Sequence, residues 1–161
     1  RARSGYQFFY DHFPLSSEIA SGRPVPPALA DFFGFVNSDE TLDFVRRVTS
    51  LPTIRWADAH ATRYRAGHFL KYHTDENAAE ARLAAYVFNF TRDWGRDWGG
   101  YLQFFDERYD VEAGYRPIFN ALNLFTVPAD HSVSMVAAYV RSSRLSITGW
   151  FRGDDPPPDA R

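Results

Sequence analysis

The chain has 161 residues, and its hydrophobic content of 45% with an aromatic content of 17% excludes a disordered polymer and suits one domain with a buried core. A net charge of −2 gives no general attraction to nucleic acid or to anionic membrane, and no apolar run approaches the roughly 20 residues of a membrane-spanning helix. The sequence contains no cysteine, which excludes disulfides, thiolate metal sites and cysteine nucleophiles. The cysteine count does not fix the compartment, and we expect a cytoplasmic protein.

Residues 1–52 are predicted to form a helical preface. Aromatic side chains in its first part are expected to pack in the core or to cover a ligand: Phe8, Phe9, Phe13, Phe32, Phe33 and Phe35. The clearest helix begins at Ser38, a favourable N-cap that precedes two acidic residues in the positively polarised first turn, and Pro52 ends it. The apolar face of this helix is predicted from Leu42, Val45 and Val48.

Residues 53–152 have the pattern of a strand-rich core. Gly, Pro, Asp and Asn residues separate the predicted strands, which are Ile54–Tyr64, His68–His73, Arg82–Phe90, Tyr101–Phe105, Ala121–Val127, Val133–Val140 and Arg144–Arg152. No long crossover helix divides them, so we expect a mainly β jelly roll with N-terminal helices on one outer face. Residues 153–161 form a Pro-rich tail that cannot pair into a sheet. We therefore predict a single domain over residues 1–161.

Three residues have the chemistry of a metal site. In an extended segment the side chains of His73 and Asp75 point to the same face, so both can reach one ion, although Asp75 alone is equally typical of a turn-capping aspartate. His131 supplies a third candidate at the start of a later strand. Two histidines and one carboxylate form the open site of non-heme Fe(II) oxygenases. The isolated His12 and His60 are interpreted as surface or hydrogen-bonded structural histidines.

The last predicted strand has two different faces. Arg144, Ser146, Thr148 and Trp150 alternate with a face of ordinary core residues. An arginine fork beside hydroxyl groups suits a small dicarboxylate, whereas the alternative is a solvent-facing polar stripe. The tryptophan favours the first interpretation.

Several motifs occur in an order that is similar to one enzyme family: Tyr64…Gly67…His73-x-Asp75, Arg82…Tyr86-Val87-Phe88-Asn89, Gly99-Gly100-Tyr101-Leu102, Phe125, His131-x-Val133 and Arg144-x-x-Ile147-Thr148-x-Trp150. The set resembles the Fe(II)/2-oxoglutarate-dependent prolyl hydroxylases, and most closely the branch that acts on ribosomal-protein or other peptidyl proline. The resemblance covers about residues 50–152.

The resemblance implies a double-stranded β-helix, a cupin-like jelly roll, and the following roles. His73, Asp75 and His131 would be the catalytic metal ligands for Fe(II). Arg144, Thr148 and Tyr64 would bind the cosubstrate 2-oxoglutarate, and Arg82 would contact the substrate. Where several prolyl hydroxylases carry a second tyrosine near 2-oxoglutarate, this sequence places Val87.

The implied reaction is hydroxylation of a prolyl residue in a peptide or protein. It consumes O₂ and decarboxylates 2-oxoglutarate to succinate and CO₂, with ascorbate as the expected reductant. Free proline or another small molecule is the alternative substrate, and a loop containing Trp94 and Trp98 is a candidate lid over either. A non-catalytic cupin-like module that binds a metal or ligand is the alternative outside the enzymes. Nucleic acid is disfavoured by the slightly acidic balance of charge.

Overall fold

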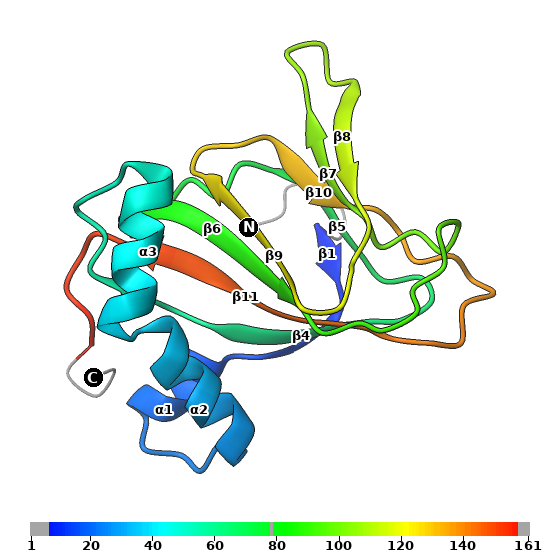
Figure 1. Cartoon of the computed structure of the whole chain (residues 1–161). Coiled ribbons are helices and arrows are strands. Elements are labelled where there is room, and N and C mark those ends of the chain that lie inside the picture. The colour runs from blue at the N-terminus through cyan, green and yellow to red at the C-terminus, as the bar shows by residue number, and fades with distance from the viewer. Residues whose placement is uncertain (1–6, 78, 158–161) are drawn as a thin grey trace.

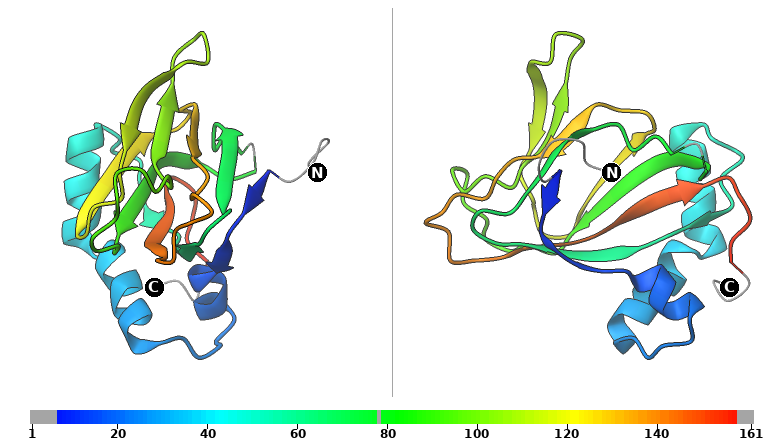
Figure 2. Two further views of the ribbon diagram at one scale, coloured as in Figure 1. Left: turned by 90° about the vertical axis from the view of Figure 1, so that its right-hand side faces the viewer. Right: turned by 180° about the vertical axis from the view of Figure 1, so that it is seen from behind.

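The computed structural model describes residues 7–77 and 79–157 (Figure 1). Two antiparallel sheets form the centre of this part of the chain, and helices lie along one side of the larger sheet (Figures 1 and 2). The helices are α1 (Leu15–Ala20), α2 (Pro27–Val36) and α3 (Asp39–Thr49). The predicted mainly β jelly roll with N-terminal helices is confirmed. In the described ranges, none of the helices has the length and apolar character needed to span a bilayer.

The larger sheet has the order β2 (Asp11–Phe13), β4 (His60–Tyr64), β11 (Arg144–Arg152), β6 (Arg82–Asn89) and β9 (Ala121–Thr126), with β3 (Trp56–Ala57) also paired to β11. The smaller sheet has the order β1 (Phe8–Phe9), β5 (Phe69–His73), β10 (His131–Val133), β7 (Leu102–Phe105) and β8 (Val111–Tyr115). From β4 to β11 the chain passes back and forth between the two sheets, except that β7 and β8 form a hairpin within the smaller one. This winding brings segments that are distant in sequence into neighbouring strands.

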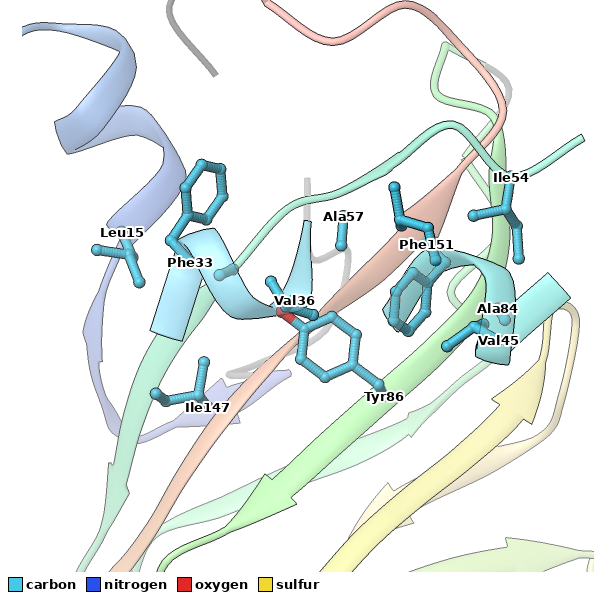
Figure 3. Close-up of a cluster of buried hydrophobic side chains, with 12 residues drawn as sticks. Leu15, Phe33, Val36, Val45, Ile54, Ala57, Ala84, Tyr86, Ile147 and Phe151 are labelled. Atoms are coloured by element: carbon cyan, nitrogen blue, oxygen red, sulfur yellow. The ribbon is translucent and has the colours of Figure 1, made fainter. Parts of the chain in front are cut away.

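The main hydrophobic core lies between the helices and the outer face of the larger sheet (Figure 3). Leu15 and Val36 on the helices are fully buried there, together with Phe151 on β11 and Tyr86 on β6. Because side chains alternate along a strand, the residues of β11 between these core positions point to the other face of the sheet, which faces the smaller sheet. The helical layer therefore buries one face of β11 and leaves the opposite face for a site.

Helix α3 begins as its sequence predicts, but its buried stripe is shorter. The Ser38 side chain accepts a hydrogen bond from the Thr41 amide at 3.3 Å, which satisfies one of the free N–H groups of the first turn. Leu42 and Val45 are buried, whereas Val48 is 54% exposed. The prediction for Val48 was wrong because the buried stripe takes in Thr41 on the first turn and ends before the last turn.

The predicted strand Val133–Val140 is only three residues long in the structure and begins earlier, at His131. After Val133 the backbone bonds irregularly to two loops, for example through the Val136 amide to the His68 carbonyl at 3.0 Å. Val136 and Val140 are apolar because they pack with Tyr64 and Trp94 in a second buried cluster. The apolar run thus marks a packed, irregular segment.

Three strands were missed, and Leu145 was wrongly assigned to the core. The edge strand β8 is exposed along most of its length, so it lacks the apolar alternation that marks a half-buried strand. The two short strands β1 and β2 lie within the predicted helical preface, where Phe8 and Phe9 are more than half exposed. Leu145 on β11 is 44% exposed because the helices cover only the other end of that strand (Figure 1).

Asp58 lies between β3 and β4 and forms hydrogen bonds to two other strands of the larger sheet, β11 and β6. Its carboxylate accepts the Trp150 amide at 2.8 Å and takes the place of a backbone acceptor. Its backbone carbonyl accepts the Tyr86 hydroxyl at 2.6 Å. Gly149 lies against the same carbonyl, so any side chain at that position would collide with the backbone.

We predict that Gly149→Ala destabilises the protein by about 2 kcal/mol or more, because the added methyl group meets rigid backbone. Gly34→Ala is the matched control. No atom lies within 4 Å of the methyl group that it adds, and alanine favours the interior of α2 by about 0.5–1 kcal/mol. Chemical denaturation of both variants would check this, and equal midpoints would contradict the packing described.

Candidate active site

Two histidines are brought face to face by the register of β5 with β10. His73 is the last residue of β5 and pairs directly with His131, the first residue of β10. The two imidazole ring centroids are 4.1 Å apart. His131 is almost fully buried, and His73 remains partly open to solvent. The ladder between two strands that are far apart in sequence therefore creates one half of a potential metal site.

Asp75 completes the cluster from a turn beyond β5. Its backbone is in the left-handed region with φ of 64°, which aspartate tolerates better than most residues. Its Oδ1 lies 3.1 Å from Nε2 of His73, and its Oδ2 lies 3.3 Å from Nε2 of His131. The prediction that an extended backbone places Asp75 beside His73 was wrong, because the strand ends at His73 and the turn returns the carboxylate.

Backbone carbonyls fix which imidazole nitrogen faces the cluster. Nδ1 of His73 lies 2.9 Å from the Lys71 carbonyl, and Nδ1 of His131 lies 2.7 Å from the Ala129 carbonyl. A carbonyl only accepts, so each Nδ1 carries the proton and each Nε2 presents a lone pair in the neutral form. The ligand atoms of both histidines and of Asp75 lie within 4.8 Å of one another. Such a set of convergent donors can hold one divalent ion.

The cluster shifts the pKa values of its own members. Burial alone would raise the pKa of Asp75, but hydrogen bonds and charge from the protonated forms of His131 and His73 outweigh it and hold this pKa well below its usual range. Burial alone would lower the pKa of His73, whereas the neighbouring Asp75 carboxylate raises it above the usual value on balance. The carboxylate is therefore ionised at neutral pH and available as a ligand.

Arg144 is a buried cation in the same cavity. Its side chain lies beside the Tyr64 ring, with the guanidinium carbon 4.9 Å from the ring centroid, and its Nε has no hydrogen-bond partner. Within the described ranges, no carboxylate forms an ion pair with it, and burial lowers its pKa from the ordinary arginine value. A buried, unpaired charge is costly, so this geometry suits an anionic ligand.

One cavity of about 280 Å³ between the two sheets contains the whole predicted site. Every site residue predicted from the sequence lines it: Tyr64, His73, Asp75, Arg82, His131, Arg144 and Thr148. The residues come from both sheets and from the turn after β5. The cavity therefore combines a possible metal centre, an unpaired cation and a mouth lined by Arg82.

Other lining residues were not predicted. Tyr10, from the segment between β1 and β2, stacks on Tyr64 with ring centroids 4.7 Å apart, and its place in the sequence carries no signal of this contact. Ala85 faces the cavity from β6, and its alternation with the buried Tyr86 could have indicated this. Val87, which the sequence places near 2-oxoglutarate, also lines the cavity.

The tryptophan loop is not a lid. Trp94 is only 2% exposed and packs in the second hydrophobic cluster, where its indole N–H donates to the Gly99 carbonyl at 2.8 Å. Trp98 packs edge-on against it, with ring centroids 5.2 Å apart. The loop supports the structure behind Arg144 and does not line the cavity.

A protein-family comparison identifies the fold and its chemistry. The family described as the 2OG-Fe(II) oxygenase superfamily matches residues 59–152 of this chain, which include all seven predicted site residues. The chain belongs to this superfamily. The family implies Fe(II), 2-oxoglutarate and O₂ as the reaction components.

A curated relative of this oxygenase is prolyl 3-hydroxylase OGFOD1 from Mus musculus, with 34% identity over 109 residues. The match covers 63% of this chain but only 19% of the mouse protein, so the chain spans about a fifth of that relative's length.

Solved structures show the same double-stranded β-helix. A prolyl-4-hydroxylase from Pseudomonas putida aligns with a TM-score of 0.64 and 23% identity, covering 79% of this chain and 63% of that one. A viral collagen prolyl hydroxylase from Paramecium Bursaria Chlorella virus-1 aligns with a TM-score of 0.60 and 15% identity, covering 92% and 81% of the two chains. At these identities the likeness shows the fold.

The cavity fits the groups that this superfamily uses. Two imidazole nitrogens and a carboxylate on one side, with the remaining directions open towards the cavity, suit Fe(II). The unpaired Arg144 suits the second carboxylate of a dicarboxylic 2-oxo acid.

We predict that the chain binds one Mn²⁺, used as a redox-stable substitute for Fe(II), and that binding weakens as pH falls. Protons compete for the lone pair of His73, and because its pKa is raised the loss begins at a higher pH than for an ordinary histidine with a pKa of about 6.5. Titration calorimetry between about pH 8 and pH 5 would measure this.

Asp75→Asn should abolish the binding, whereas Glu76→Gln, which neutralises an exposed carboxylate next to the cluster, should leave it intact. Equal affinities of these two variants, or affinity that does not change with pH, would contradict the ligand set.

Proposed function

We propose that this chain is an Fe(II)- and 2-oxoglutarate-dependent dioxygenase that hydroxylates a prolyl residue in a peptide or protein. The observation that carries the proposal is a single cavity in which the His73, Asp75 and His131 donors converge near the buried, unpaired Arg144. The names of the mouse and bacterial relatives support proline as the target. The catalytic part is assigned to residues 53–152.

The bound iron, with 2-oxoglutarate and O₂, supplies the oxidation that replaces a C–H bond of proline by C–OH and yields succinate and CO₂. The chain's own residues prepare this step. The Lys71 and Ala129 carbonyls hold the two imidazoles in the tautomer that leaves Nε2 free for the metal. Asp75 contributes the negative charge, which the low pKa maintains at neutral pH.

Arg144 orients the cosubstrate. With 2-oxoglutarate bound, its guanidinium would pair with the distal carboxylate through charge-assisted hydrogen bonds, and the hydroxyl of Thr148, which lines the same cavity, would add a donor. Because burial strengthens a charge-assisted hydrogen bond, this pairing is stronger than the same contact at the surface. Tyr64 closes that end of the cavity with the phenol beside Arg144.

Aromatic rings limit the access of water to the metal-binding face. Phe125 packs edge-on against the His131 imidazole with centroids 4.9 Å apart, and Phe104 packs in turn against Phe125 at 4.9 Å. The reacting carbon is thereby held in a largely apolar environment, which protects reactive species from side reactions with water.

At the mouth, Arg82 and Trp150 form a substrate-binding pair. The Arg82 guanidinium lies 3.5 Å from the centroid of the Trp150 ring, and its Nη1 donates to the Asp75 carbonyl at 3.3 Å. Arg82 thus connects the metal-binding turn to the wall of the mouth. A peptide carbonyl next to the target proline would accept from this guanidinium while the proline ring packs on the tryptophan.

An extended substrate is favoured over free proline by the shape of the site. The mouth opens beside Arg82 and Trp150 into a second hollow of about 390 Å³ on the same face of the larger sheet. A free amino acid would use only the first cavity. A non-catalytic module would bind metal in the same place but would not need Arg144.

We predict that Arg144→Met raises the KM for 2-oxoglutarate by roughly a hundredfold or more, because two charged hydrogen bonds of about 1.5–3 kcal/mol each would be lost. The same change removes an unpaired buried charge, so the variant should be at least as stable as the wild type. Succinate formation with Fe(II) and ascorbate, together with thermal unfolding, would measure both effects.

Arg63→Met, on the exposed side of β4, is the matched control and should retain full turnover. His131→Ala should lose turnover entirely. A wild-type protein that binds metal yet produces no succinate, even with proline-rich peptides present, would favour the binding module.

We predict that Arg82→Ala raises the KM for a prolyl peptide by roughly tenfold or more, because a peptide carbonyl loses a charged donor. Decarboxylation of 2-oxoglutarate without peptide should persist, because the variant retains the metal donors and Arg144. Comparing hydroxylated peptide with succinate separates these effects. Equal loss of both activities would instead point to damage of the Asp75 turn, which Arg82 also contacts.

A further inference from the structure

The second hollow lies along β11, beyond the wall formed by Arg82 and Trp150. Residues Thr148 and Trp150 line both cavities, so the two are adjoining parts of one groove. His12 and His60 line only the second hollow, on the inner face of β2 and β4. The other side is formed by helix α1, where the exposed Ser17 lies at the rim.

We propose that this second hollow is a binding subsite for a proline-rich segment of the substrate, two or three residues from the target proline. The inference rests on the proposed prolyl hydroxylase function and specifies which peptides it prefers. It is carried by the aromatic lining, an unused hydrogen-bond donor, the pairing of the charges and a proline of this chain that lies in the wall.

Aromatic rings make up five of the fourteen residues that line the hollow. Tyr10, Trp56, His60 and Trp150 all contribute to the lining, and His60 packs edge-on against Trp150 with centroids 5.7 Å apart. Burial lowers the pKa of His60 to about 4, so its ring is uncharged at neutral pH. Aromatic-lined grooves bind the pre-formed polyproline II conformation with little loss of chain entropy.

The indole N–H of Trp150 is buried and has no acceptor among the described residues. An unsatisfied donor in the wall between two cavities suits a ligand that carries acceptors. Polyproline II segments have free carbonyl groups because they form no internal hydrogen bonds. A carbonyl of such a segment would satisfy the indole.

The charges around the hollow are already paired, so the wall suits a neutral ligand. Glu80 accepts from Arg82 at 2.7 Å. Arg152 pairs with Asp154 at 2.6 Å and with the buried Asp58 at 3.3 Å. A strongly charged ligand would have to compete with these pairs, whereas proline does not.

The chain places one of its own prolines in this wall. Pro157 lines the second hollow, in the segment that follows β11. Two ion pairs fix that segment, from Arg152 to Asp154 and from Arg55 to Asp155, the second at 2.6 Å. A pyrrolidine ring is thus compatible with this surface.

The spacing of the two cavities determines which residue of the substrate lies in the second hollow. Trp150 at the wall and Arg152 in the second hollow are two residues apart on β11, or roughly 7 Å. A polyproline II chain advances about 3.1 Å per residue, so a ring in the second hollow lies about two or three residues from the target.

The test uses a decaproline probe and a Gly-Ser decapeptide of the same length, with the full chain and its variants. Decaproline should bind the wild type, as measured by calorimetry, and the Gly-Ser peptide should not. Ser17→Trp should weaken decaproline binding by about tenfold or more, because the new side chain fills the hollow from its rim. Ser17→Ala is the matched control and should bind like the wild type.

A second variant keeps the test informative if Ser17→Trp does not fold. His12→Ala removes an exposed aromatic ring from the wall, and its binding should fall by about two- to tenfold, the range expected for one aromatic contact. Equal decaproline affinity in Ser17→Trp and Ser17→Ala, or equal binding of both peptides to the wild type, would overturn the subsite.

The succinate assay separates this proposal from the proposed function. If Ser17→Trp retains decarboxylation of 2-oxoglutarate and hydroxylates a short prolyl tripeptide normally, but loses the advantage of a proline-rich peptide, both hold. If turnover is normal but the variants do not alter peptide affinity, the subsite fails alone. If decaproline binds at the hollow but no sample forms succinate, the hydroxylase function fails alone.

Discussion

The pairing of β5 with β10 is the constraint on which the site depends. It places His73 opposite His131, although 57 residues of chain lie between them, and it fixes both imidazoles against strand-end carbonyls. A shift of one residue in this register would turn one histidine to the other face of the sheet. The turn at Asp75 has a function only in this register, because its carboxylate reaches Nε2 of both rings at once. The strand alternation between sheets, which separates the paired strands along the chain, is therefore also what assembles the metal donors.

The inner face of the larger sheet retains a feature that a purely structural core would not keep. Arg144 is buried without a carboxylate partner in the described part of the chain, and its Nε is unsatisfied. Such a group lowers the stability of the ligand-free protein. The helices compensate on the outer face, where Leu15, Val36 and Phe151 are almost completely buried. The two faces of β11 thus have different roles. The outer face stabilises the sheet, and the inner face carries a charge that becomes favourable when an anion binds.

Much of the fold and the inner part of the site could be predicted because local sequence determines them. Period-two alternation marks β11, and the residue types His73, Asp75 and His131 indicate a metal site, although the turn that returns Asp75 to His73 could not be read from their spacing. The groove beyond the mouth could not be predicted in this way. Tyr10 reaches Tyr64 from a segment with no periodic pattern, and His12 meets His60 across 48 residues with Nε2 3.2 Å from Nδ1. Both histidines are structural in the sense expected from the sequence, since they bond to each other, but only the tertiary fold places them in one wall.

Asp58 stabilises the Trp150 wall between the two cavities, and it lines only the second hollow. Asp58 accepts the Trp150 amide through its side chain, and its backbone carbonyl receives the Tyr86 hydroxyl from the outer core. Burial raises the pKa of Asp58 to about 6, although the Trp150 amide and Arg152 oppose the shift. Protonation is therefore easier in the folded chain than in the unfolded one, so the contribution of Asp58 to stability is largest at low pH and declines as pH rises through about 6. Near neutral pH the ionised carboxylate is retained at some cost in stability, and it is then a stronger acceptor for the amide and for Arg152. The orientation of Trp150, and with it the wall shared by both cavities, thus depends on an ionised side chain that joins the hydrophobic core to the groove.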